Sequence, residues 1–153
     1  MYGPQFVVLP DGWVHVVNRE WGFETDLPGW YSKWPTSWGG SGIYYQTRFT
    51  SSDWANFDLL VANWRPTTKS ASADLLAILE NERLQGKVEV LTDQTANPAA
   101  PMIEFRTASP GTSTVHRRVA IRDGRLLEMR IIGADGIPPA DVTRAFDSFR
   151  WTR

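Results

Sequence analysis

Short runs of apolar, β-branched and aromatic residues, several alternating with polar residues, make up most of the chain, and this pattern predicts strands. Pro, Gly, Asn and Asp separate the runs and mark turns. The predicted strands are residues 6–9, 13–18, 23–27, 43–50, 57–64, 87–91, 102–107, 113–122 and 125–132. We expect the first two to form a hairpin and strands 43–50 and 57–64 to pair.

The clearest local signal is the Asp123-Gly124 dipeptide between the last two runs. It suits a two-residue type I′ turn, because both central residues of that turn need positive φ. In this register Ile121 and Leu126 share one face of the hairpin, while Leu127 lies on the other. Both faces therefore carry apolar side chains, so the sheet needs a covering layer on each side, and we expect helices on opposite faces.

Helical spacing of apolar residues occurs at two places. One helix is predicted to begin after Ser70 or Ser72, with Asp74 in its first turn, and to end at Gly86. The second begins at Pro138-Pro139, and its apolar stripe consists of Val142, Ala145, Phe146 and Phe149. The chain is thus predicted to be one α+β domain over residues 1–153, a three-layer α/β/α sandwich with a mainly antiparallel sheet. Residues 150–153 could add an edge strand.

Eight tryptophans are many for 153 residues, and seven of them fall within the first 64 residues. Trp13, Trp54 and Trp64 lie in or beside predicted strands and are expected in the core or on a sheet face. The stretch 30–38 is polar, contains Pro and is followed by Gly39-Gly40-Ser41-Gly42, so it is expected to be a long irregular loop.

Aromatic side chains in such a loop have fewer structural duties than those on strands, and binding residues concentrate in loops. Tyr31, Trp34 and Trp38 are therefore the candidate binding residues. Pinning of the loop by its indoles is the alternative role for these side chains.

Charge and composition exclude several classes of protein. With 16 basic and 17 acidic residues the net charge is -1, so no nucleic-acid partner is expected. The chain has no cysteine, which removes disulfides, Cys-ligated metals and thiol nucleophiles. No segment has the roughly 18 apolar residues of a membrane span, and the first residues lack a secretion signal. Cytoplasmic and extracytoplasmic locations both stay open.

Candidate catalytic groups are few. The two histidines, His15 and His116, each lie on a predicted strand and are expected to be structural. Glu24 and Asp26 share one face of a strand, where the wet side of an edge strand is their ordinary role. No Gly-x-Ser-x-Gly motif or phosphate-binding loop is present, and we predict no metal or cofactor.

Charged residues on the hairpin predict an ion cluster. Arg117 and Arg130 are cross-strand neighbours in the two-residue-turn register, and Glu128 lies diagonal to Arg117. A structural cluster is favoured over an anion site.

The Leu27-Pro28-Gly29-Trp30 step, the strand pair and helix that follow, and the closing hairpin strand with Ala145-Phe146-Asp147-Ser148-Phe149 resemble the PsbP-like, Mog-type and DcrB-like superfamily. The resemblance extends from about residue 23 to residue 151. It implies an antiparallel sheet between helical layers. Members of that superfamily mostly act as assembly factors, accessory subunits, chaperones or lipoproteins, and no functional residue is carried over to this chain.

These observations favour a non-enzymatic binding or accessory module that recognises a protein or peptide through the aromatic residues of the 30–38 stretch. One alternative is a carbohydrate-binding extracytoplasmic domain that uses the same tryptophans. Another is a small hydrolase that uses Glu24, Asp26 or His15. The edge strand predicted at residues 87–91 could also pair with a second copy to form a homodimer.

Overall fold

A computed structural model describes residues 4–29, 31–37, 42–49, 54–66, 69–108 and 114–152, with the backbone alone for 31–37. Its largest element is a seven-stranded sheet in which every strand is antiparallel to its neighbours. The strand order is β4 (Tyr31–Ser37), β5 (Gly42–Arg48), β6 (Asn56–Asn63), β10 (Arg125–Ile132), β9 (Val115–Arg122), β8 (Met102–Ala108) and β7 (Lys87–Asp93).

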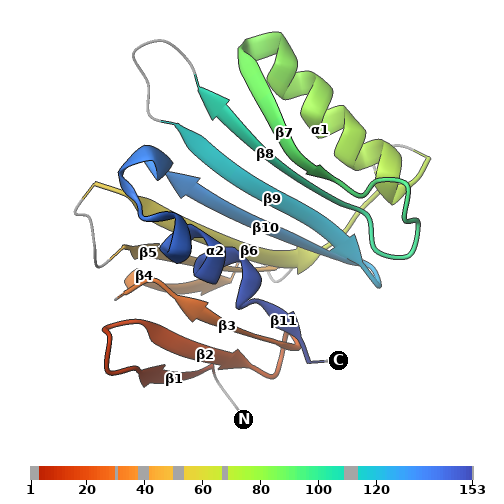
Figure 1. The fold of residues 1–153 in the computed structure, drawn as a ribbon. Coiled ribbons are helices and arrows are strands. Elements are labelled where there is room, and N and C mark those ends of the chain that lie inside the picture. Colours follow the sequence, from red (N-terminus) through yellow and green to blue (C-terminus); the bar gives the residue numbers. More distant parts are fainter. Residues whose placement is uncertain are drawn as a thin grey trace.

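A second antiparallel sheet joins the two ends of the chain. Its order is β1 (Gln5–Val8), β2 (Val14–Asn18), β3 (Phe23–Leu27) and β11 (Arg150–Trp151). Figure 1 shows the red and orange N-terminal strands beside the blue C-terminal strand β11. The C-terminal tail therefore adds an edge strand, as expected, but to a separate small sheet that the sequence did not predict.

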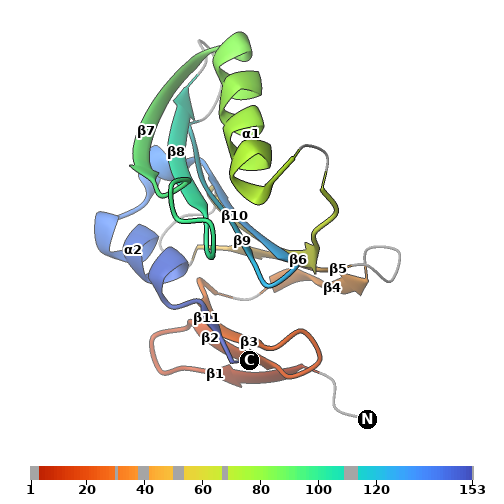
Figure 2. The same ribbon diagram turned by 90° about the vertical axis from the view of Figure 1, so that its right-hand side faces the viewer.

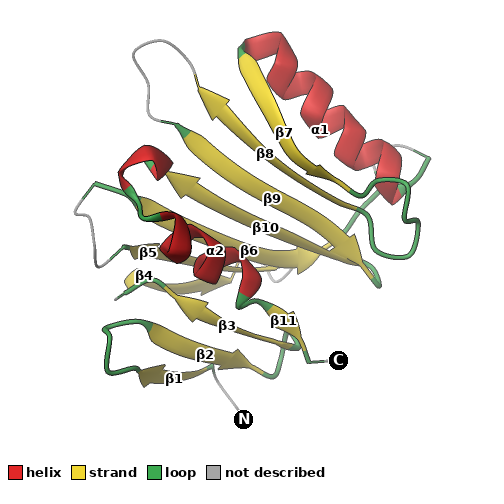
Figure 3. Cartoon of the chain, viewed as in Figure 1, coloured by secondary structure: helices red, strands yellow, loops and turns green. Residues whose placement is uncertain are grey.

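The two helices lie on opposite faces of the large sheet, as Figure 2 shows. Helix α1 (Ala71–Gln85) packs over β7, β8 and β9. Helix α2 (Pro139–Asp147) follows a short 3₁₀ turn, η1 (Ala134–Gly136), and packs with the small sheet in one hydrophobic core. Figure 3 shows α2 leading into β11 of the small sheet. The predicted α+β class with helices on opposite faces of an antiparallel sheet is confirmed.

Each face of the large sheet has its own hydrophobic core. On the α2 face, strands β5, β6 and β10 pack against the small sheet and α2 through buried side chains that include Phe23, Tyr45, Phe57, Met129 and Phe146. On the α1 face, the buried residues are Leu75, Leu79, Ile103, Phe105, Val119 and Ile121. The alternation of side chains along β9 and β10 supplies both cores.

Local sequence explains where these elements begin and turn. The Ser70 hydroxyl accepts a hydrogen bond from the Ala73 amide at 3.1 Å and caps α1, with Asp74 in the first turn as predicted. Asp123 and Gly124 have φ of 50° and 75°, the positive values that a type I′ turn requires. Leu126 consequently pairs with Ile121 and Leu127 with Ala120, in the predicted register.

Two expectations about the tryptophan-rich part of the chain were wrong. The backbone of 31–37 is the edge strand β4 and not an irregular loop, because it pairs with β5 through two register irregularities. Trp13 is buried and Trp64 packs on the α1 core, but Trp54 is 89% exposed and belongs to neither core nor sheet face.

Strand β7 is an edge of the large sheet, as predicted for 87–91. Its Val90 and Leu91 are exposed. Pairing of this edge with a second copy stays a prediction. Among the described residues, neither helix combines the length and apolar character that crossing a membrane requires.

Gly42 lies where β5 passes close to β6, and this contact yields a stability prediction. A Cβ at Gly42 would lie 2.9 Å from the Ala62 Cβ and 3.0 Å from the Val61 carbonyl oxygen. We expect Gly42→Ala to lower the free energy of unfolding by about 1–3 kcal/mol, since two sheet strands would have to separate. Urea denaturation measures this. Gly136→Ala is the matched control, because a Cβ there meets nothing within 4 Å; equal effects of the two substitutions would contradict the prediction.

Candidate functional site

A groove runs along the α2 face of the large sheet, between the strands and the C-terminal segment of the chain. It encloses about 240 Å³. Its floor is apolar and consists of Met102 on β8, Ala120 on β9, and Leu127 and Met129 on β10. These residues are in register across the three strands, because Ala120 pairs with both Met102 and Leu127. We call this feature the aromatic groove after its wall.

The wall consists of Phe146 at the end of α2, Phe149 after it, and Trp151 on β11. The Phe149 ring meets the Trp151 ring edge to face at 4.9 Å and stacks on Phe23 of the small sheet at 5.3 Å. The small sheet thus fixes the position of the wall. A preset aromatic surface loses little conformational entropy when it binds.

Arginines from the β9–β10 hairpin form the rim. Arg122 faces Arg125 across the hairpin, although like charges in such a pair repel. Arg125 lies 4.2 Å over the Trp151 ring and donates a hydrogen bond to the Trp21 carbonyl. The Arg122 side chain is half exposed, and its Nε atom lies 3.5 Å from the exposed carboxylate of Asp123. The rim therefore carries positive charge beside an apolar floor.

Arg118 is held in place by several contacts. Its guanidinium donates to Glu104 at 2.7 Å, to Asp147 at 2.9 Å and to the Phe146 carbonyl at 3.2 Å. It also lies 5.3 Å over the Phe146 ring. These contacts connect strand β9 to the end of α2, so Arg118 fixes the width of the groove at this point.

Glu104, which binds Arg118, also contacts the buried imidazole of His116. His116 Nε2 lies 3.2 Å from Glu104 Oε2, with side chains only 6% and 13% exposed, and the imidazole meets the Phe146 ring at 4.6 Å. Burial alone would raise the pKa of Glu104, but the hydrogen bond from His116 and the charge of Arg118 outweigh it and lower that pKa. His116 is thus a buried structural residue, as expected.

Two of the three sequence-predicted binding residues lie on a strand that does not form the groove. The backbones of Tyr31 and Trp34 belong to β4, and Trp38 lies outside the described residues. Strands β5 and β6 separate β4 from the strands that form the groove floor. The role predicted for these three aromatic residues stays a prediction.

The carboxylates and histidine considered for hydrolysis form an ion network between the small sheet and α2. His15 Nδ1 lies 2.8 Å from Asp26 Oδ1, and Arg144 donates to the other Asp26 oxygen at 3.2 Å and to Asp11 at 2.5 Å. Glu24 pairs with Arg150. This arrangement fixes α2 against β3, so these groups have structural partners.

The residues that form the groove were not proposed as a site from the sequence. The arginines of the hairpin were visible as a basic cluster, and Phe146 and Phe149 were predicted on a helix stripe. No sequence signal indicates that residues 146–151 and the hairpin face one another.

Comparison with known proteins gives a likeness to a solved structure at the level of the fold. No protein-family model matches the chain, and no curated protein matches it. The chain is similar to the solution structure of cyanobacterial PsbP (CyanoP) from Synechocystis sp. PCC 6803, with a TM-score of 0.45 and 12% identity over 99% of this chain and 94% of that one. This neighbour is a PsbP protein, whereas the Mog-type and DcrB-like parts of the predicted resemblance stay predictions. A likeness of this size carries no partner, activity or residue role over to this chain.

The contacts of Glu104 with His116 and Arg118 predict how the stability of the protein changes in acid. A carboxyl whose pKa is lowered by folding stabilises the protein above its ordinary pKa, 4.5 for Glu, and that contribution is lost as the pH falls through the lower folded value. We expect Glu104→Gln to cost about 1–3 kcal/mol at pH 7, because His116 and Arg118 lose a buried charged acceptor. The difference in free energy of unfolding between the variant and the parent protein should become smaller below pH 4.5.

Urea denaturation between pH 3 and pH 7 measures this difference. Glu89→Gln on the exposed edge strand β7 is the control, with the same chemical change at an exposed position. A difference that stays constant over the whole pH range would contradict the prediction.

Proposed function

We propose that this protein is a non-enzymatic binding module whose aromatic groove takes an extended, apolar segment of a protein partner with an acidic residue beside it. The observation that carries the proposal is the combination of an apolar floor and an aromatic wall with a rim of arginines. The apolar groove would fit an apolar segment, and the arginine rim would favour an acidic residue next to that segment.

The apolar part of the groove would supply most of the affinity. Burying one Leu or Phe side chain stabilises a complex by roughly 1.5–3 kcal/mol. An exposed arginine–carboxylate pair adds about 0.2–1 kcal/mol. Two such side chains and one ion pair contribute at most about 7 kcal/mol, and association itself costs at least about 4 kcal/mol, so we expect dissociation constants in the millimolar range or weaker.

The role of the arginines would be selection. Arg118 is already paired with Glu104 and Asp147, so it acts as part of the frame. Arg122 is half exposed at the rim and faces a second arginine, which makes an incoming carboxylate favourable there. An acidic residue next to the apolar segment would meet Arg122, whereas a basic residue would be repelled.

The ion network around Asp26 supports a binding function over a hydrolase. Asp26 is engaged by His15 and by Arg144, and Glu24 by Arg150. A general base within this network would have to break a structural ion pair before it could accept a proton.

The test uses matched synthetic peptides with a central Phe or Leu and either Asp or Lys on both sides, titrated by fluorescence anisotropy. We expect saturable binding of the acidic peptides only. Ala120→Leu should weaken it at least tenfold, because the larger side chain fills the floor while remaining apolar. Arg122→Glu should weaken it about threefold to tenfold through charge reversal alone.

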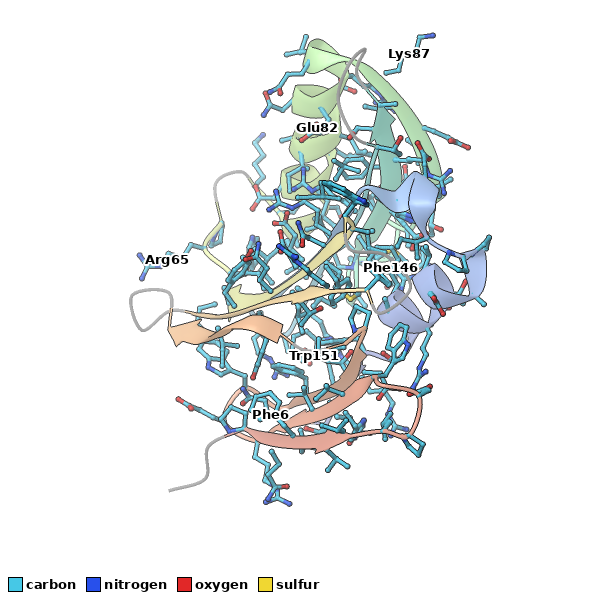
Figure 4. The ribbon with its side chains drawn as sticks, turned by 90° about the vertical axis from the view of Figure 1, so that its left-hand side faces the viewer. Phe6, Arg65, Glu82, Lys87, Phe146 and Trp151 are labelled. Atoms are coloured by element: carbon cyan, nitrogen blue, oxygen red, sulfur yellow. The ribbon has the colours of Figure 1, made fainter. Side chains whose placement is uncertain are left out.

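Arg65→Glu is the matched control for Arg122→Glu, because Arg65 is exposed and points away from the molecule (Figure 4). Binding that survives Ala120→Leu but is lost in Trp34→Ala would place recognition on β4 and overturn the groove as the site. Equal binding of acidic and basic peptides would overturn the role of the rim.

A further inference from the structure

A second, smaller pocket lies on the opposite, α1 face of the large sheet. It encloses about 130 Å³ and is lined by Tyr44, Asp58, Leu60, Glu128 and Arg130. The pocket lies over two neighbouring sets of cross-strand partners on β5, β6 and β10. In one set Asp58 is paired with Gln46 and Arg130, and in the other Leu60 is paired with Tyr44 and Glu128. Central strands of a sheet hold these side chains at fixed spacing.

Asp58 is the unusual member of this pocket. Its side chain is only 6% exposed, and its Oδ2 atom accepts hydrogen bonds from Arg130 at 2.8 and 3.3 Å. Within the described part of the chain, its Oδ1 atom has no hydrogen-bond partner. A buried, unpaired carboxylate oxygen is unfavourable in a folded protein, and one that lines a pocket indicates that a donor binds there.

The charges around the pocket favour a positively charged donor. Glu128 Oε1 accepts from Arg117, which also pairs with Glu82 on α1, each at 2.8 Å. Three carboxylates therefore surround two guanidinium groups, those of Arg117 and Arg130, and the cluster has a formal charge of -1. The predicted structural ion cluster at Arg117 and Glu128 is confirmed, but it leaves one negative charge uncompensated.

Tyr44 supplies a third acceptor and part of an apolar lining. Burial, the negative charge of Asp58 and a hydrogen bond to the Asp58 carboxylate raise the pKa of Tyr44 to about 12. Its hydroxyl is therefore neutral at physiological pH and keeps an oxygen that can accept a hydrogen bond. The Tyr44 ring and Leu60 offer apolar contact to a short carbon chain.

We propose that this pocket binds an alkylammonium group. An ammonium nitrogen has three donors, and the pocket offers the unpaired Asp58 oxygen, the Tyr44 hydroxyl and the second oxygen of Glu128. A hard metal ion prefers six or more oxygen ligands, which this set does not provide. The ammonium can belong to a lysine of a protein or to a small free amine, since both present the same chemistry.

The test compares charged and neutral probes on the intact protein. Butylammonium, 1,4-diaminobutane and N-acetyl-lysine methylamide are titrated while amide chemical shifts are followed by NMR, with N-butylacetamide as the uncharged probe. We expect saturable shifts on β5, β6 and β10 at millimolar amine and none from N-butylacetamide. Tighter binding of the lysine derivative than of the two free amines would identify a protein ligand, and the reverse order a small amine.

Two variants locate the site. Asp58→Asn removes the charge and converts an acceptor into a donor, so it should weaken amine binding at least tenfold. Glu128→Gln should weaken it about threefold. Asp123→Asn, on the exposed hairpin turn, is the matched control and should leave binding unchanged.

Three results would overturn the proposal: equal shifts from the neutral probe, no saturable shift from any amine, or unchanged affinity in both Asp58→Asn and Glu128→Gln. The comparison of the amines with N-butylacetamide uses the unsubstituted protein, so it stays valid even if a substitution perturbs the fold. The pocket and the aromatic groove lie on opposite faces of the sheet, and failure of one proposal leaves the other untouched.

Discussion

The register of the β9–β10 hairpin is the constraint on which the rest of the structure depends. The turn at Asp123-Gly124 adopts positive φ at both residues and sets which side chains lie opposite one another. A shift by one residue would move every side chain of a strand to the other face. Since β9 and β10 contribute to both cores, such a shift would expose Met129 and Ile131 and place charged neighbours in the interior.

This one sheet separates two chemically different surfaces. On the α2 face, the small sheet positions the aromatic wall over apolar strand residues, and arginines collect at the hairpin end. On the α1 face, α1 packs over β7, β8 and β9, and the neighbouring rows of β5, β6 and β10 form a charged pocket around Asp58. Alternation along each strand is what allows one element to serve both surfaces.

The candidate site was only partly predictable. The sequence pointed to Tyr31, Trp34 and Trp38 as binding residues, and their role stays a prediction. The aromatic wall of the groove consists of other residues, Phe146, Phe149 and Trp151, which the sequence did not indicate as a site. Their positions depend on the pairing of β11 with β3, which joins residues more than a hundred positions apart. No local pattern records such a pairing. The orphaned oxygen of Asp58 likewise follows from burial and neighbours, which a sequence does not show.

The sequence by itself determined the features that depend on neighbouring residues: the strand-rich content, the start of α1 at Ser70 or Ser72 and its end at Gly86, and the hairpin register. Backbone preferences and helix capping depend on only a few neighbouring residues, so they can be predicted from the sequence. Only the tertiary structure decided that the strands divide into two sheets and that the 31–37 stretch is an edge strand. It also decided where two pockets form, because hydrophobic burial is non-directional and does not specify which strand meets which.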